Sequence, residues 1–121
     1  MGTIQSFTDL ICWQKAHRLA IEVYKNTGTF PKEEVYGLTS QCRRAASSIS
    51  ANIAEGFGRR TNKERAQFYV QARGSVAELQ NHLLLARDIG YLSKENFKSL
   101  ADMTVEVSKL INGIIKSTSK L

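Results

Sequence analysis

The sequence predicts an all-α protein, a single antiparallel up-down-up-down four-helix bundle that spans residues 1–121 as one domain. Apolar residues recur at three- and four-residue steps in four separate segments, which is the spacing of amphipathic helices. Short connections separate these segments, and short connections make consecutive helices antiparallel neighbours. No stretch alternates apolar and polar residues between turn signals as a strand does, so we expect no sheet.

The first two helices are predicted from their apolar spacing and from the residues that end them. The first carries its apolar stripe over residues 10–24, and the Asn-Thr-Gly run at 26–28 ends it. Residues 30–34 form a short irregular or one-turn segment, because proline and two glutamates suit the first turn of a helix. The second helix covers residues 39–57, with glycines at its end.

The third and fourth helices are predicted mainly from their first residues. Thr61 and Glu64 have the spacing of a capping box, in which each residue satisfies free N–H groups at the start of a helix. The helix that follows ends at Gly90. Ser93 is the expected N-cap of the fourth helix, whose inward residues lie within 97–114.

The second helix is unusually rich in small residues. Alanine, serine and glycine cover more than one of its faces over residues 45–56. One small face is enough for a close neighbour within the bundle, so the second indicates contact with another subunit. The alternative is a tightly packed monomeric bundle.

Basic charge is concentrated in the middle of the chain. The protein has 17 basic and 11 acidic residues, a net charge of +6. Residues 39–75 hold seven basic and two acidic side chains and therefore contribute +5 of that total. Concentrated positive charge attracts polyanions such as RNA or DNA. The candidate phosphate contacts are Arg43, Arg59, Arg60, Lys63, Arg65 and Arg73.

Polar residues form matching rows on the second and third helices. If the two helices make a hairpin about residues 59–60, Arg44 lies opposite Ser75 and Glu78, and Asn52 lies near Gln67 or Phe68. We expect a buried Arg44–Glu78 pair that fixes the register of the helices, and a ligand site is the alternative. The predicted polar seam comprises Arg44, Ser48, Asn52, Glu55, Ser75 and Glu78.

The sequence offers little support for an enzyme or for a cofactor. Bundle di-iron sites require Glu-x-x-His motifs, whereas Glu78 and His82 are four residues apart. No glycine-rich loop follows a strand, so we expect no enzyme, cofactor or metal. No apolar run approaches the roughly 20 residues that cross a bilayer, so no membrane partner is expected. The two cysteines, Cys12 and Cys42, fit reduced and buried thiols of a cytoplasmic protein.

Three segments of the chain resemble a known family. They are FTDLICWQKAHRLAIEVY (residues 7–24), FPKEEVYGLTSQCRRAASSISANIAEGFGR (residues 30–59) and FYVQARGSVAELQNHLLLARDIGYL (residues 68–92). They are similar to the four-helix-bundle proteins encoded within intervening sequences of bacterial 23S ribosomal RNA genes, which are also called S23-type proteins. That family in turn resembles, more distantly, the accessory variability protein of diversity-generating retroelements.

This resemblance implies a cyclic homopentamer with a basic surface that binds RNA or DNA. The distant relative adds a reverse transcriptase as an implied partner, and the family supplies no catalytic residues. Two functions are therefore expected as alternatives. The first is an oligomer that binds nucleic-acid backbone through a basic surface. The second is an assembly or protein-interaction scaffold without nucleic-acid binding.

Overall fold

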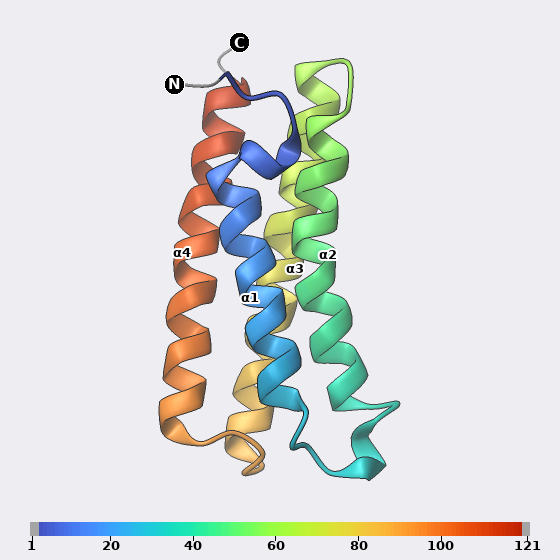
Figure 1. Cartoon of the computed structure of the whole chain (residues 1–121), viewed down its shortest axis with the longest axis vertical. Coiled ribbons are helices and arrows are strands. Elements are labelled where there is room, and N and C mark those ends of the chain that lie inside the picture. The colour runs from blue at the N-terminus through green and yellow to red at the C-terminus, as the bar shows by residue number, and fades with distance from the viewer. Residues whose placement is uncertain (1–2, 120–121) are drawn as a thin grey trace.

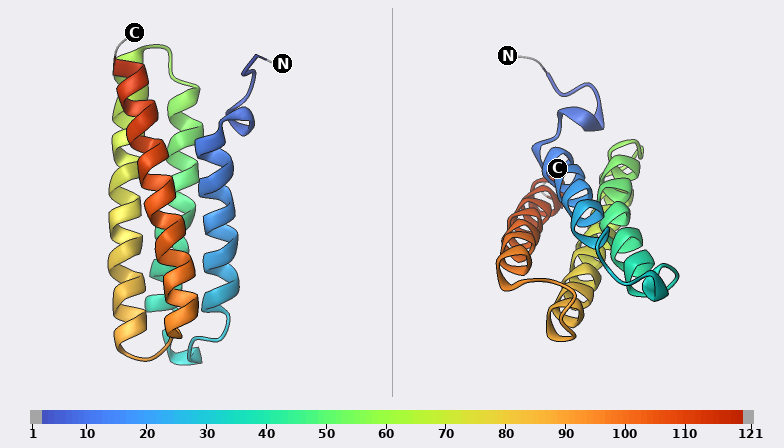
Figure 2. Two further views of the ribbon diagram at one scale, coloured as in Figure 1. Left: turned by 90° about the vertical axis from the view of Figure 1, so that its left-hand side faces the viewer. Right: turned by 60° about the horizontal axis from the view of Figure 1, so that its bottom comes forward.

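The computed structural model describes residues 3–119, and that part of the chain is helical without any strand. Four long helices stand side by side as an antiparallel bundle (Figures 1 and 2). The prediction of an all-α protein with four helices is confirmed. The elements are η1 (Phe7–Asp9), α1 (Ile11–Thr27), η2 (Lys32–Glu34), α2 (Leu38–Phe57), α3 (Asn62–Asp88) and α4 (Lys94–Ser119).

The helix boundaries follow from local hydrogen bonds. The Thr61 hydroxyl accepts a hydrogen bond from the Glu64 backbone N–H (3.1 Å) and donates one to the Glu64 carboxylate (2.9 Å), which starts α3. Gly90 ends α3 with a φ of 89°, a conformation that glycine adopts without strain. Ser93 accepts a hydrogen bond from the Asn96 N–H (3.1 Å) and starts α4.

Helix α1 ends slightly later than its sequence indicates. Thr27 belongs to the helix and is only 2% exposed. Its hydroxyl donates to the Val23 carbonyl (2.8 Å) and accepts from Arg43 Nε (2.9 Å). A threonine that bonds back into its own helix needs no water, so this predicted helix breaker is satisfied as the last residue of α1.

All four helices contribute to one apolar core. The largest fully buried aliphatic side chains are Leu19, Ile49, Ile53, Leu79, Leu83, Leu100 and Ile111. The thiols of Cys12 and Cys42 are free and buried among them. Burial raises the pKa of the Cys12 thiol to about 12 and that of Cys42 to about 11, because the low-dielectric core disfavours the thiolate. No helix within residues 3–119 is both long and apolar enough to cross a membrane.

The small residues of α2 serve two faces. On the inward face Gly56 lets α3 come close, since a Cβ there would lie 2.8 Å from Tyr69 Cε1 and 2.9 Å from Phe68 Cβ. On the outward face Ser47 and Ala51 are exposed. The inward small face is thus explained by packing within the bundle, while the outward one faces solvent in the single chain.

The connection between α1 and α2 is tied down at several points. Phe30 is 7% exposed and its ring centroid lies 5.3 Å from that of Tyr91, in the α3–α4 connection. The Glu34 carboxylate accepts hydrogen bonds from the Leu38 N–H (3.0 Å) and the Tyr91 hydroxyl (2.9 Å). These bonds lower the pKa of Glu34, because they stabilise its charged form. The connection is therefore a fixed part of the bundle end.

Candidate functional site

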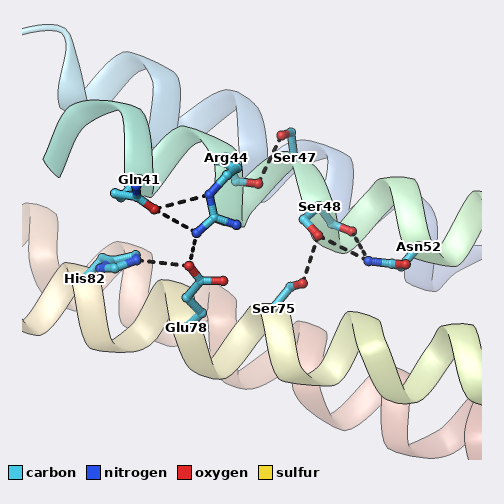
Figure 3. Close-up of polar contacts among 8 residues, drawn as sticks. All are labelled: Gln41, Arg44, Ser47, Ser48, Asn52, Ser75, Glu78 and His82. Carbon is cyan, nitrogen blue, oxygen red and sulfur yellow. Dashed lines mark hydrogen bonds and ion pairs between the residues drawn. The ribbon is translucent and has the colours of Figure 1, made fainter. Parts of the chain in front are cut away.

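The predicted seam between α2 and α3 begins with an ion pair. Arg44 Nη2 donates to Glu78 Oε2, and the same guanidinium donates to Gln41 Oε1 from Nη2 (2.7 Å) and Nε (3.2 Å) (Figure 3). His82 Nε2 lies 3.3 Å from Glu78 Oε2 on the next turn of α3. The hydrogen bond from Arg44 lowers the pKa of Glu78, against a smaller opposing effect of desolvation, and His82 lowers it further.

The expectation that the Arg44–Glu78 pair is buried is wrong. The side chain of Arg44 is 54% exposed and that of Glu78 is 36% exposed. The neighbouring inward positions are taken by Ala45 and Leu79, which are fully buried. Arg44 and Glu78 therefore lie next to these buried positions, on the rim of the groove between α2 and α3, where water solvates them.

Farther along the groove the seam continues with uncharged side chains. The hydroxyls of Ser48 and Ser75 lie 2.9 Å apart (Figure 3). Asn52 Nδ2 donates back to the Ser48 carbonyl (2.9 Å) and to its hydroxyl (3.1 Å), and among residues 3–119 it forms no hydrogen bond to α3. Two short hydroxyl side chains allow α2 and α3 to approach closely while both stay hydrogen-bonded.

Glu55 does not belong to this seam. Its carboxylate lies 3.3 Å from Arg59 Nη2, one turn farther along, and its side chain is 58% exposed. Glu55 contacts Arg59 on its own helix and forms no hydrogen bond or ion pair to α3 among residues 3–119, so the prediction that it belongs to the seam is wrong. Glu55 instead neutralises one arginine of the α2–α3 turn.

Two of the arginines at that turn hold the turn together. The guanidinium of Arg59 lies 4.5 Å from the centroid of the Phe68 ring. Arg65 Nε donates to the Arg59 carbonyl (2.8 Å) and Nη1 to Asn62 Oδ1 (3.3 Å). Both side chains therefore close the turn between the two helices and have only part of their donor capacity left for a ligand.

Arg43 and Arg73 lie away from this turn. Arg43 bonds Thr27 Oγ1 (2.9 Å) and the Tyr24 carbonyl (3.3 Å), near the start of α2. At 1.5 Å per residue this is about 20 Å from the end of that helix. Arg73 donates to Asn112 Oδ1 of α4 (3.1 Å), partway along α3. The structure thus does not bring the six predicted phosphate contacts together.

Arg60 and Lys63 are the basic residues of the turn that remain available. Both are exposed, and neither forms an ion pair or hydrogen bond with its side chain among residues 3–119. Lys63 also borders a groove between the start of α3 and the end of α4, with a volume of about 900 Å³. Gln67, Gln71 and Thr118 line this groove as well.

The glutamines of this groove were missed as site residues by sequence reasoning. Lys63, Gln67 and Gln71 are spaced by four residues, which places them in a row on one side of α3. That row was visible in the sequence. The contribution of Thr118 was not, because it depends on where α4 ends relative to α3.

The described residues bring no cluster of metal-ligating side chains together. Within residues 3–119, no group of three His, Cys, Asp or Glu side chains could hold a metal ion. The His17 ring stacks on Trp13 with their centroids 4.7 Å apart. The α2–α3 turn and the groove beside Lys63 offer hydrogen bonding and positive charge.

The fold and surface define this protein as a helical bundle with a polar seam between α2 and α3 and a basic α2–α3 turn. The chain belongs to the 23S rRNA-intervening sequence protein family, whose profile matches residues 8–113. This membership confirms the resemblance noted from the three sequence segments.

The fold is also found in a solved structure. A protein of unknown function from the S23 ribosomal protein family of Bacteroides thetaiotaomicron is similar, with a TM-score of 0.79 and 23% sequence identity. The similarity covers 88% of this chain and 99% of that one, and at this identity it establishes the shared fold. No curated protein matches the chain.

Proposed function

We propose that this protein is a homo-oligomer that binds the phosphate backbone of RNA or DNA through the α2–α3 end of its bundle. The observation that carries the proposal is the pair Arg60 and Lys63, which are exposed and unpaired among residues 3–119 at the most basic part of the chain. Unpaired cations keep their full attraction for phosphate, since no internal carboxylate competes.

The oligomer multiplies a modest local charge. Arg59, Arg60, Lys63 and Arg65 bring four positive charges to the turn, and Glu55 and Glu64 bring two negative ones, which leaves +2 per chain. A closed ring of five chains, the assembly that the family resemblance implies, would carry about +10 on one face. Such a face attracts a polyanion far more strongly than one bundle does.

The chemistry of the site favours backbone over base recognition. The groove beside Lys63 offers the side-chain amides of Gln67 and Gln71, which suit phosphate and sugar oxygens. Contacts of this kind position a nucleic acid without reading its sequence. Binding is therefore expected to depend strongly on salt and weakly on sequence.

A salt titration of matched variants tests the proposal. The variant Arg60→Ala/Lys63→Ala removes both available cations, and every phosphate that is no longer neutralised flattens the log–log salt slope on duplex DNA by about 0.9. The control Lys32→Ala/Lys94→Ala removes the same charge at the opposite end of the bundle, where both lysines are exposed. The proposal requires weaker binding and a flatter slope for the first variant only. Equal slopes for both variants would contradict it.

The oligomer is tested separately, by light scattering. We infer an oligomer because the outward small face of α2, with Ser47 and Ala51, needs no partner inside the bundle, and a closed homopentamer because the family resemblance implies one. A monomeric mass at tens of micromolar would remove the oligomer from the proposal.

A scaffold without nucleic-acid binding is the second candidate function. It is favoured by the internal contacts of four of the six predicted phosphate contacts, Arg43, Arg59, Arg65 and Arg73. An oligomeric protein that shows no salt-dependent binding to unrelated RNA and DNA would establish the scaffold instead.

A further inference from the structure

Exposed apolar side chains gather in a groove on the outer face of α3 and α4. The groove has a volume of about 210 Å³ and is lined by Leu84, Phe97, Ala101 and Val105, among others. Leu84 is 42% exposed and Val105 is 48% exposed, so their side chains meet water in the single chain. Clustered apolar surface of this kind marks a docking site more often than scattered residues do.

A second apolar feature projects from the connection between α1 and α2. Tyr36 is 94% exposed and Val35 beside it is 53% exposed. The connection is held by the Glu34 carboxylate, which binds the Leu38 N–H (3.0 Å) and the Tyr91 hydroxyl (2.9 Å). A rigid connection presents Tyr36 with little conformational entropy left to lose on binding.

The two features suit a head-to-tail contact between copies of this chain. The α1–α2 connection projects at the end of the bundle beside α2 and away from α4, while the groove lies between α3 and α4 (Figures 1 and 2). Leu84 lies four residues before the end of α3 at Asp88, a distance of about 6 Å at 1.5 Å per residue. The exposed Tyr36, which we call the knob, and the groove are therefore at the same end of the bundle. A closed ring requires two complementary features on opposite sides of the subunit, at the same height along the bundle.

The groove fits one aromatic side chain. Its volume of about 210 Å³ is equivalent to about seven water molecules. This volume is below the roughly 300 Å³ of small-molecule sites. Gln80 belongs to the lining and donates through Nε2 to Thr104 Oγ1 (3.0 Å). Its Oε1 accepts no hydrogen bond within residues 3–119, so it can accept one from a tyrosine hydroxyl. A buried tyrosine needs such an acceptor.

We propose that Tyr36 of one copy inserts into the α3–α4 groove of the next copy, and that this contact joins the subunits head to tail. The inference rests on the proposed homo-oligomer and names its interface. In this contact the exposed Val35 would pack against the rim of the groove in the next copy.

Two variants that remove opposite halves of the contact test it. Tyr36→Ser removes the knob and keeps the groove, whereas Val105→Arg blocks the groove and keeps the knob. Each variant alone is expected to be a monomer by light scattering, with its subunit affinity weakened roughly thirtyfold or more, as for a central interface residue. Mixed together, they still share one intact contact and are expected to form a one-to-one dimer.

Matched variants separate the interface from folding. Val70→Arg places the same charge on an exposed position of α3 outside the groove lined by Leu84 and Val105, and Tyr36→Phe keeps the ring. Both are expected to retain the wild-type mass, and all four variants the wild-type circular dichroism. Single variants that keep the wild-type mass, or a mixture that fails to pair, would overturn the inference and leave the oligomer standing. A monomeric wild type would overturn both.

Discussion

Gly56→Ala is expected to destabilise the bundle, although alanine is the better helix former. The new Cβ would lie 2.8 Å from Tyr69 Cε1 and 2.9 Å from Phe68 Cβ, closer than carbon atoms pack. Tyr69 is only 4% exposed, so its ring cannot swing out to solvent. The helix propensity of alanine gains up to about 1 kcal/mol, while overpacking costs about 1–3 kcal/mol. The expected net loss is up to about 2 kcal/mol of unfolding free energy.

Replacing glycine with alanine is expected to stabilise the fold at two other positions of the chain. A Cβ at Gly74 or at Gly113 meets nothing within 4 Å, and both glycines lie inside helices. Gly74→Ala and Gly113→Ala are therefore each expected to stabilise the fold by about 0.5–1 kcal/mol. They serve as controls for the propensity effect without the steric one.

Urea unfolding at one protein concentration measures all three variants, because assembly adds to apparent stability. Unchanged m-values would show that the unfolded state is the same, so the midpoints report stability directly. If Gly56→Ala is as stable as Gly74→Ala, the close approach of α2 and α3 at this glycine is not the reason for its presence.

Three further predictions concern the seam and the thiols. Arg44→Ala and Glu78→Gln in a double-mutant cycle should couple by less than about 1 kcal/mol, because a half-exposed ion pair is screened by water; a coupling near 3 kcal/mol would indicate a buried pair. Glu78 has a lowered pKa, so its bond to Arg44 stabilises the fold above the ordinary carboxyl pKa and is lost as the pH falls through the lowered value. Acid unfolding of Glu78→Gln should therefore show a shallower pH dependence than wild type in that range, and an identical curve would contradict this. Cys12 and Cys42, with thiol pKa values raised to about 12 and about 11, should react with a thiol reagent at pH 8 only after unfolding. Rapid reaction of the folded protein would place a thiol at the surface.

The fold was predictable because its signals are local. Apolar spacing defines the four helices, and the capping residues Thr61 and Ser93 start two of them where expected. The hairpin register between α2 and α3 was also predictable, since the turn at residues 59–60 determines which residues of the two helices lie opposite each other. It correctly brought Arg44 together with Glu78.

The degree of burial and the state of each cation were not predictable in the same way. Whether Arg44 lies inside the groove or on its rim depends on a small rotation of α2 that a repeat of four residues does not resolve. Whether an arginine is available depends on neighbours far along the chain, such as Asn112 for Arg73 and Thr27 for Arg43. The exposure of Tyr36 likewise depends on the packing of a connection whose sequence has no regular pattern.

The even number of helices has a practical consequence for work with this protein. Helix α1 begins, and α4 ends, at the same end of the bundle as the α2–α3 turn (Figure 1). A purification tag or fused protein attached beyond these helices would therefore lie at the same end of the bundle as the α2–α3 turn and its proposed phosphate-binding face. It would shield that face in binding measurements and leave the Tyr36 end unobstructed. Removal of terminal tags before the assay avoids this interference.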